Sequence, residues 1–181
     1  MALGATIYVF NIELADSDRG VYQPLQLRVA RHPSESEEYF LTRILAYCLE
    51  YTEGISFSNG LFEPEEPTIA VRDLTGALSA WIDVGAPEAA RLHRASKPAP
   101  RVAVYTHKDA AQLVARLGGA ERIHRVEQLE VYAMDFEWLS SLAGKLQRRT
   151  AFTLTVSEQH LYLSLGEETF SGVIRRVPVV Q

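Results

Sequence analysis

The chain has a single cysteine and no long run of apolar residues. Cys48 alone cannot form an internal disulfide, which favours a reducing compartment. The apolar runs are far shorter than the roughly 20 residues that a membrane-spanning helix requires. The N-terminal segment MALGATIYVF lacks the basic head and the cleavage site of a signal peptide. These absences predict a cytoplasmic protein that makes no membrane contact.

Acidic residues are missing from one window of an otherwise acidic chain. The net charge is -5, which argues against broad nucleic-acid binding because phosphate contacts depend on clustered lysine and arginine. Yet no acid lies between Glu88 and Asp109. This window holds the candidate nucleic-acid-binding residues Arg91, Arg94, Lys97 and Arg101. The alternative is that they form an ordinary solvated helix face.

Length and composition predict one globular domain over residues 1–181, and the order of predicted strands and helices along it is typical of the α/β (α+β) class. The apolar share is 47% and the charged share 23%, as in ordinary globular proteins. Residues 5–14 and 21–30 predict an N-terminal β-hairpin whose second strand, with Pro24, lies at a sheet edge. A helix is predicted over 34–50, with Ser34 as its N-cap. Three strands are predicted after it, over 54–61, 69–73 and 78–85.

A crossover unit follows these strands. A helix over 87–97 leads into a strand over 101–106, so the strands on either side of the helix should run parallel. Asp109 and Asp135 are predicted N-caps of two further helices, the second running to about Arg148 with Phe136 inward. A strand is predicted over 129–134, and the chain ends in a β-meander over 151–156, 160–165 and 168–177.

Two aspartates, Asp73 and Asp83, end two of the predicted strands. Paired carboxylates suit magnesium, which takes oxygen ligands, and a nearby lysine would stabilise charge developing on a phosphate. Each aspartate also has a structural alternative. Asp73 can cap its strand by accepting from the Thr75 or Gly76 amide, and Asp83 can form an ion pair with Arg91 or Arg101. Spacing alone leaves both alternatives open.

Three long segments carry a resemblance to a known family. They are MALGATIY, ARHPSESEEYFLTRILAY and EPTIAVRDLTGALSAWIDVGAPEAARLHRASKPAPRVAVYTH. Along nearly its full length the chain resembles the YaeQ family. The resemblance implies a PD-(D/E)XK restriction-endonuclease-like core, in which helices flank a mixed central sheet. The predicted order of helices and strands from residue 34 to residue 106 is the order that such a core needs.

The resemblance also implies roles for particular residues. Asp73 and Asp83 match the two motif acids that hold metal and take part in catalysis. Val84 matches the variable position, whose carbonyl can face a metal. Glu38 matches the acid on the first helix and is expected on its inward stripe, where an arginine partner is the alternative.

The motif lysine is absent from its usual position. Gly85 stands two residues after Asp83, where the motif has lysine. Lys97 on the following helix is the available substitute, with Arg94 or Arg91, although a lysine there also suits the end of a helix. The implied function is a magnesium-dependent phosphodiesterase acting on nucleic acid. The alternative is a non-catalytic module on the same fold that binds nucleic acid or protein.

Overall fold

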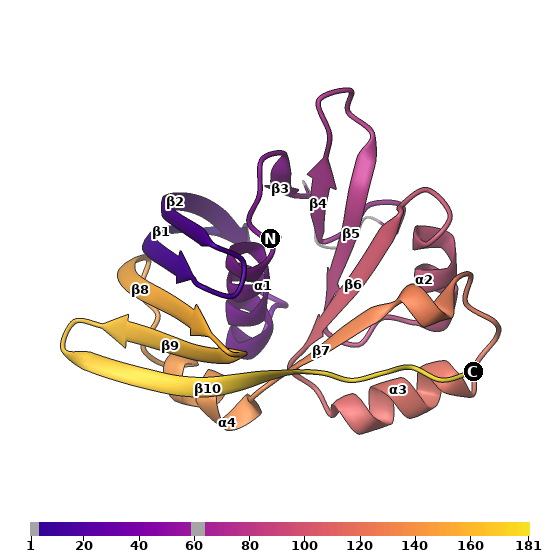
Figure 1. Ribbon diagram of the computed structural model, residues 1–181. Helices are drawn as coiled ribbons and strands as arrows, with labels where there is room; N and C mark the ends of the chain where they lie inside the picture. Colours follow the sequence, from indigo (N-terminus) through magenta and orange to yellow (C-terminus); the bar gives the residue numbers. More distant parts are fainter. Residues whose placement is uncertain (1–3, 59–63) are drawn as a thin grey trace. The chain divides into compact units, whose positions relative to one another are not determined.

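The computed structural model describes residues 4–58 and 64–181 (Figure 1). Within them the chain forms two compact units. Unit 1 comprises residues 4–41 and 135–174, and unit 2 comprises residues 42–58, 64–134 and 175–181. Ten strands and four α-helices are described, so the fold is of the mixed α+β class. That the two units fold as one domain stays a prediction.

Unit 1 is built on five strands, in the order β2-β1-β8-β9-β10. The N-terminal hairpin is confirmed, because β1 (Thr6–Asp16) and β2 (Val21–Arg31) pair antiparallel. Pro24 lies on β2, which is the edge strand, as expected. The C-terminal meander is also confirmed by the antiparallel pairing of β8 (Arg149–Ser157), β9 (His160–Leu165) and β10 (Glu168–Arg176). The parallel pairing of β1 with β8 was not predicted.

One face of this sheet carries the core of unit 1. Every second residue is buried along β1 from Phe10 onwards and along β8 from Thr150 onwards, including Leu14 and Leu154. Helix α4 (Phe136–Ala143) adds Trp138, which packs so closely on Gly172 that a Cβ there would lie 2.6 Å from the Trp138 Cγ. The alternate residues of the same strands are exposed or half-buried. The sheet is therefore apolar on one face and open on the other.

Two predicted helix boundaries in this part of the chain are wrong. Helix α1 (Glu37–Leu49) is capped by Ser36, whose Oγ accepts from the Tyr39 amide at 3.0 Å, whereas the Ser34 hydroxyl pairs with His32. Helix α4 is capped by Asp135 as expected, but it ends at Ala143, not near Arg148. Phe136 is 54% exposed and does not face inward.

Unit 2 is built on the strands β3 (Ile55–Phe57), β4 (Ile69–Arg72), β5 (Leu78–Val84), β6 (Arg101–Thr106) and β7 (Glu130–Met134). They lie in the order β3-β4-β5-β6-β7, with antiparallel pairing up to β5 and parallel pairing after it. The predicted crossover is thus confirmed, since β5 and β6 run parallel on either side of α2 (Ala89–Ala95). The strand predicted over 54–61 is observed over Ile55–Phe57, and residues 59–61 lie outside the described residues.

The core of unit 2 forms where helices cover the parallel strands. Leu92 of α2, Leu117 of α3 (Ala110–Gly118) and Val104 of β6 belong to one buried cluster. Asp109 caps α3 as predicted by accepting from the Gln112 amide at 3.1 Å. A short 3₁₀ helix, η1 (Val126–Gln128), precedes β7. Over the residues that the structure describes, no helix is both long enough and apolar enough to cross a membrane.

Candidate functional site

Asp83 is a buried carboxylate held by an arginine. Its side chain on β5 is 2% exposed, and the guanidinium of Arg91 on α2 donates hydrogen bonds to both of its oxygens. The Arg91 Nε lies 2.7 Å from Oδ2, and Nη2 lies 3.0 Å from Oδ1. The Thr68 amide also donates to Oδ1, at 3.3 Å. Of the alternatives that the sequence left open, the structure shows the ion pair with Arg91.

Arg91 does more than neutralise Asp83. It donates to the carbonyl oxygens of Pro64, at 3.1 Å, and of Glu66, at 2.7 Å. Its guanidinium carbon also lies 5.2 Å from the centroid of the Trp81 ring, a distance typical of a cation–π contact. Arg91 therefore ties the segment before β4 to β5, and the planar fork of a guanidinium suits this several-partner role.

Asp73 lies in an exposed turn just past the end of β4. Its Oδ1 accepts from the Thr75 hydroxyl at 2.6 Å, the Thr75 amide at 2.9 Å and the Ala77 amide at 3.0 Å. The hydrogen bond from the Thr75 hydroxyl is the main reason that the pKa of Asp73 is lowered. An aspartate that bonds to its own following backbone stabilises a turn. Asp73 is exposed, and its hydrogen bonds show the capping role that the sequence left open.

The structure does not bring Asp73 and Asp83 together. In the β4–β5 hairpin Ile69 pairs with Ile82, so Asp83 lies beside Thr68 at the start of β4. Asp73 lies at the opposite end of the hairpin, where its amide bonds to the Ala77 carbonyl. Five residues of strand separate the two positions, which is roughly 17 Å. An antiparallel hairpin thus separates two acids that both end a strand in the sequence.

The other residues of the predicted site have different surroundings. Val84 is buried in β5, in register with Tyr105 of β6. Glu38 is half-buried on the part of α1 that belongs to unit 1, and its place in a metal site stays a prediction. Arg94, on α2, and Lys97, just after it, are exposed.

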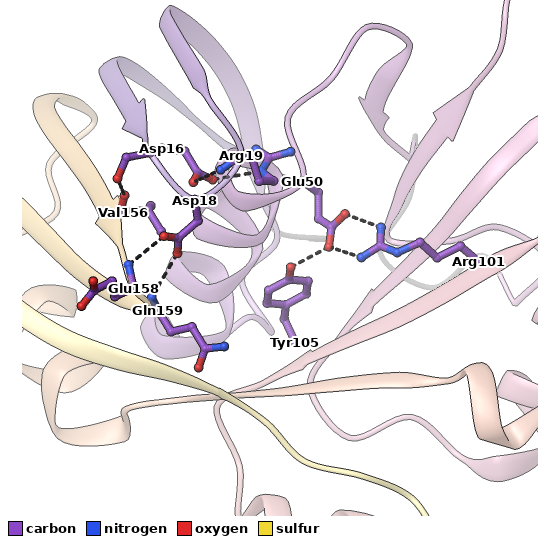
Figure 2. A network of polar contacts seen from close by, with 10 residues as sticks. Asp16, Asp18, Arg19, Glu50, Arg101, Tyr105, Val156, Glu158 and Gln159 are labelled. Carbon is purple, nitrogen blue, oxygen red and sulfur yellow. Dashed lines mark hydrogen bonds and ion pairs between the residues drawn. The ribbon is translucent and has the colours of Figure 1, made fainter.

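Arg101, a predicted nucleic-acid contact, is instead the centre of a polar network in unit 2. Its guanidinium contacts Glu50 at 2.5 and 2.9 Å and Glu130 at 2.6 and 3.1 Å. The Tyr105 hydroxyl donates to Glu50 at 2.6 Å, and the Tyr132 hydroxyl donates to Glu130 at 2.5 Å. Figure 2 shows Glu50 between Arg101 and Tyr105. Two carboxylates bound to one guanidinium leave little positive charge for a phosphate.

The network changes the proton affinity of its members. Burial, followed by the nearby charge of Glu50, raises the pKa of Tyr105 well above its ordinary value. Burial and the hydrogen bond to Glu130 raise the pKa of Tyr132 to about 12. Burial alone would raise the pKa of Glu130, but hydrogen bonds from Arg101 and Tyr132 outweigh it and lower that pKa. The network therefore favours the charged form of Glu130 and the neutral forms of both tyrosines.

Sequence reasoning missed this network because its members are far apart along the chain. Glu50 directly follows α1 and lies 51 residues from Arg101, and Glu130 lies 29 residues from Arg101. Tyr105 is buried in a strand, where an aromatic residue is expected to be part of the hydrophobic core. The usable signal was that Arg101 and Glu130 each begin an apolar strand, since a charged residue beside a buried core requires a partner.

The arrangement does not fit a shared magnesium ion. Asp83 is bound by Arg91, and Asp73 lies at the other end of the hairpin. Within residues 4–58 and 64–181, no group of three or more histidine, cysteine, aspartate and glutamate side chains is arranged to hold a metal. Magnesium needs several convergent oxygen ligands, and these residues do not supply them.

Fold and site together define a mixed α+β protein in which Asp83 forms an ion pair and Asp73 stabilises a turn. The family model described as "YaeQ protein" matches residues 1–173, so the chain belongs to the YaeQ protein family. It is 30% identical over 164 residues to "Uncharacterized protein YaeQ" of Escherichia coli (strain K12), covering 91% of each chain. The Salmonella typhi protein of the same name is 29% identical over 164 residues.

Two crystal structures share this fold. The YaeQ protein from Pseudomonas syringae matches with a TM-score of 0.87 and 28% identity, covering 96% of each chain. The YaeQ protein from Xanthomonas axonopodis pv. citri also matches with a TM-score of 0.87, at 25% identity, covering 97% of this chain and 99% of that one.

Proposed function

We propose that this YaeQ family protein is a non-catalytic module that binds nucleic acid through the exposed cations at the end of α2. One observation carries the proposal. Arg91 on α2 is committed to Asp83, whereas Arg94 and Lys97 are exposed and have no acidic partner in the described part of the chain. The ion pair removes an acid that catalysis would need, and the two exposed cations remain available for phosphates.

The magnesium-dependent nuclease is the competing hypothesis. The element order α1, β3, β4, β5, α2, β6 supports it, because a PD-(D/E)XK core needs this order. Against it, Asp83 would have to leave Arg91, and Asp73 would have to come from the far end of the hairpin. Releasing a buried carboxylate from its arginine costs several kcal/mol. The non-catalytic module requires no such rearrangement.

Binding should be weak and should decrease moderately as salt is added. The net charge of -5 opposes a polyanion, and only local cations attract it. Two phosphate contacts predict that the logarithm of the association constant falls with the logarithm of salt concentration with a slope of about -1.8 on duplex DNA.

Fluorescence anisotropy of labelled duplexes in a salt series tests the proposal. The variant Arg94→Gln/Lys97→Gln should weaken binding and bring the salt slope close to zero. The matched control is Lys108→Gln/Arg122→Gln, which removes the same charge from two other exposed positions of unit 2. This control should keep most of the affinity. Equal loss in both variants, or no binding by the wild type, would overturn the proposal.

A cleavage assay separates the two hypotheses. Supercoiled DNA and RNA are incubated with the wild type in magnesium and in manganese, beside Asp83→Asn. We expect no cleavage by either protein above a buffer control. Cleavage by the wild type that disappears in a folded Asp83→Asn variant would establish the nuclease and contradict the non-catalytic role.

A further inference from the structure

The exposed side of the sheet in unit 1 has an unusual composition. This outer face comprises the odd-numbered residues of β1 from Ile7 to Ala15 and of β8 from Arg149 to Ser157. It also comprises the even-numbered residues of β2 from Tyr22 to Ala30 and of β9 from His160 to Ser164. Glu13 is the only acid among them, although the chain has 23 acids against 18 lysines and arginines. The outer face is therefore locally basic.

Two arginines lie side by side on the outer face. Val9 of β1 pairs with Arg28 on β2 and with Arg149 on β8, so the three side chains form one row. Neither arginine has an acidic partner in the part of the chain that the structure describes. Together with Gln26 and Val9 they line an open hollow of about 410 Å³. Their Cα atoms are two strand spacings apart, roughly 10 Å, so both long side chains can reach one anion in this hollow.

Aromatic rings lie further along the same face. Ala15 pairs with Tyr22 and with Thr155, and Thr155 pairs with Tyr162, so both tyrosines belong to one row. Tyr22 is 62% exposed and Tyr162 is 39% exposed. His160 stacks on Tyr162, with centroids 6.3 Å apart and planes 18° apart. The tyrosine row lies six residues of strand from the arginine row, roughly 20 Å.

We propose that the outer face of unit 1 binds single-stranded nucleic acid. Arg28 and Arg149 hold a phosphate in the hollow, and the exposed rings of Tyr162 and Tyr22 stack on bases. A sheet face that offers cations and flat rings suits an unpaired strand, because its bases expose both ring faces while its backbone stays charged. The bases of a duplex are already stacked on one another and cannot use the tyrosines.

This proposal does not depend on the α2 cations, because it uses other residues in the other unit. A few nucleotides of extended single strand can cover the distance from the arginine row to the tyrosine row. The exposed polar side chains between them, such as Asn11 and Thr153, can donate to phosphates or to base edges. Glu13 lies on the same face and should reduce the affinity.

The test uses the full chain and a 12-nucleotide oligothymidylate, with affinity measured by fluorescence anisotropy. Arg28→Gln/Arg149→Gln and, separately, Tyr162→Ala should each weaken binding about tenfold. Tyr162→Phe keeps the ring and should bind like the wild type. All three positions are exposed on the open face, so circular dichroism should show an unchanged fold. Equal loss in Tyr162→Phe and Tyr162→Ala would overturn the stacking role.

A second measurement locates the strand and separates the two proposals. An oligonucleotide carrying 4-thiothymidine is photo-crosslinked, and the linked peptide is identified by mass spectrometry. Crosslinks should fall on β2 or β9 and should persist in Arg94→Gln/Lys97→Gln. Crosslinks confined to the region of α2 would overturn the outer-face proposal and leave the α2 proposal standing. Equal competition by poly-glutamate would also overturn it, because it would show an acidic-peptide site.

Discussion

At the scale of single residues, the ion pair between Asp83 and Arg91 stabilises unit 2. Arg91→Ala would leave a carboxylate that is 2% exposed without its counter-charge and free the carbonyls of Pro64 and Glu66. We expect a loss of about 3 kcal/mol in the free energy of unfolding, measured by urea denaturation. Asp83→Asn/Arg91→Met should recover part of this loss because it removes the unpaired charge.

The matched control is the exposed ion pair between Arg116 and Glu88. It has a similar separation, 2.7 Å, but Glu88 is 80% exposed. Because water screens such a pair, Arg116→Ala should lower the free energy of unfolding by less than about 1 kcal/mol. If Arg91→Ala lowers the free energy of unfolding no more than Arg116→Ala does, burial does not strengthen the ion pair of Asp83.

At the scale of secondary-structure elements, the β8–β9 hairpin has a strained turn that a distant aspartate supports. Glu158 and Gln159 both have positive φ, 50° and 64°, which glycine adopts more readily than other residues. The Asp18 carboxylate, in the loop after β1, accepts from both of their amides, at 2.7 and 3.0 Å (Figure 2). Asp18 thus compensates for two residues that are unfavourable in this conformation.

Gln159→Gly should relieve part of this strain. We expect a free energy of unfolding about 1 kcal/mol higher than that of the wild type, as measured by thermal or urea denaturation. Glu167→Gly in the β9–β10 turn is the control, because Glu167 is not among the residues with positive φ. The free energy of unfolding of that variant should not rise, and it should fall slightly because glycine adds conformational freedom to the unfolded chain. A gain of equal size in both variants would contradict the role of backbone strain.

At the scale of the whole molecule, the network around Arg101 should make the protein less stable at alkaline pH. The folded pKa of Tyr132, about 12, is above the ordinary value of 10.0, and the pKa of Tyr105 is raised as well. For a group whose pKa is higher in the folded state, the stabilising contribution is complete below the unfolded pKa and is lost as pH rises through the folded pKa. Stability should therefore decline from about pH 10 to pH 12.

Urea denaturation at intervals between pH 8 and pH 12 measures this decline. Tyr132→Phe should be less stable at pH 8, because the hydrogen bond to Glu130 is lost, but its stability should fall less steeply above pH 10. Tyr162→Phe is the control, since Tyr162 is on the exposed face of unit 1. Equal slopes for the wild type and Tyr132→Phe would show that the network does not cause the decline.

Local signals predicted most of the elements. Strand-like runs bounded by turn residues predicted both hairpin strands and the meander, and the aspartate caps at Asp109 and Asp135 act within one turn of their helices. The errors were also local. Ser34 and Ser36 are equally good capping residues, and the sequence pattern favoured Ser34 because Glu37 follows it by three positions.

The candidate site was harder to predict because proximity along a chain does not fix proximity across a sheet. Asp73 and Asp83 each end a strand, and in parallel strands these ends would meet. The strands β4 and β5 are antiparallel, so the two ends separate. The ion pair of Asp83 with Arg91 spans only eight residues and was among the alternatives that the sequence offered.

The sequence by itself determined the family, the identity of most strands and helices, and the direction of the β5–α2–β6 crossover, because these depend on local periodicity and chain connectivity. Only the tertiary structure decided that β8 pairs with β1, that Arg101 is held by Glu50 and Glu130, and that Arg28 and Arg149 share one row. These contacts join segments that are distant in the chain. Their energy comes from burial and strand pairing, which no local pattern records.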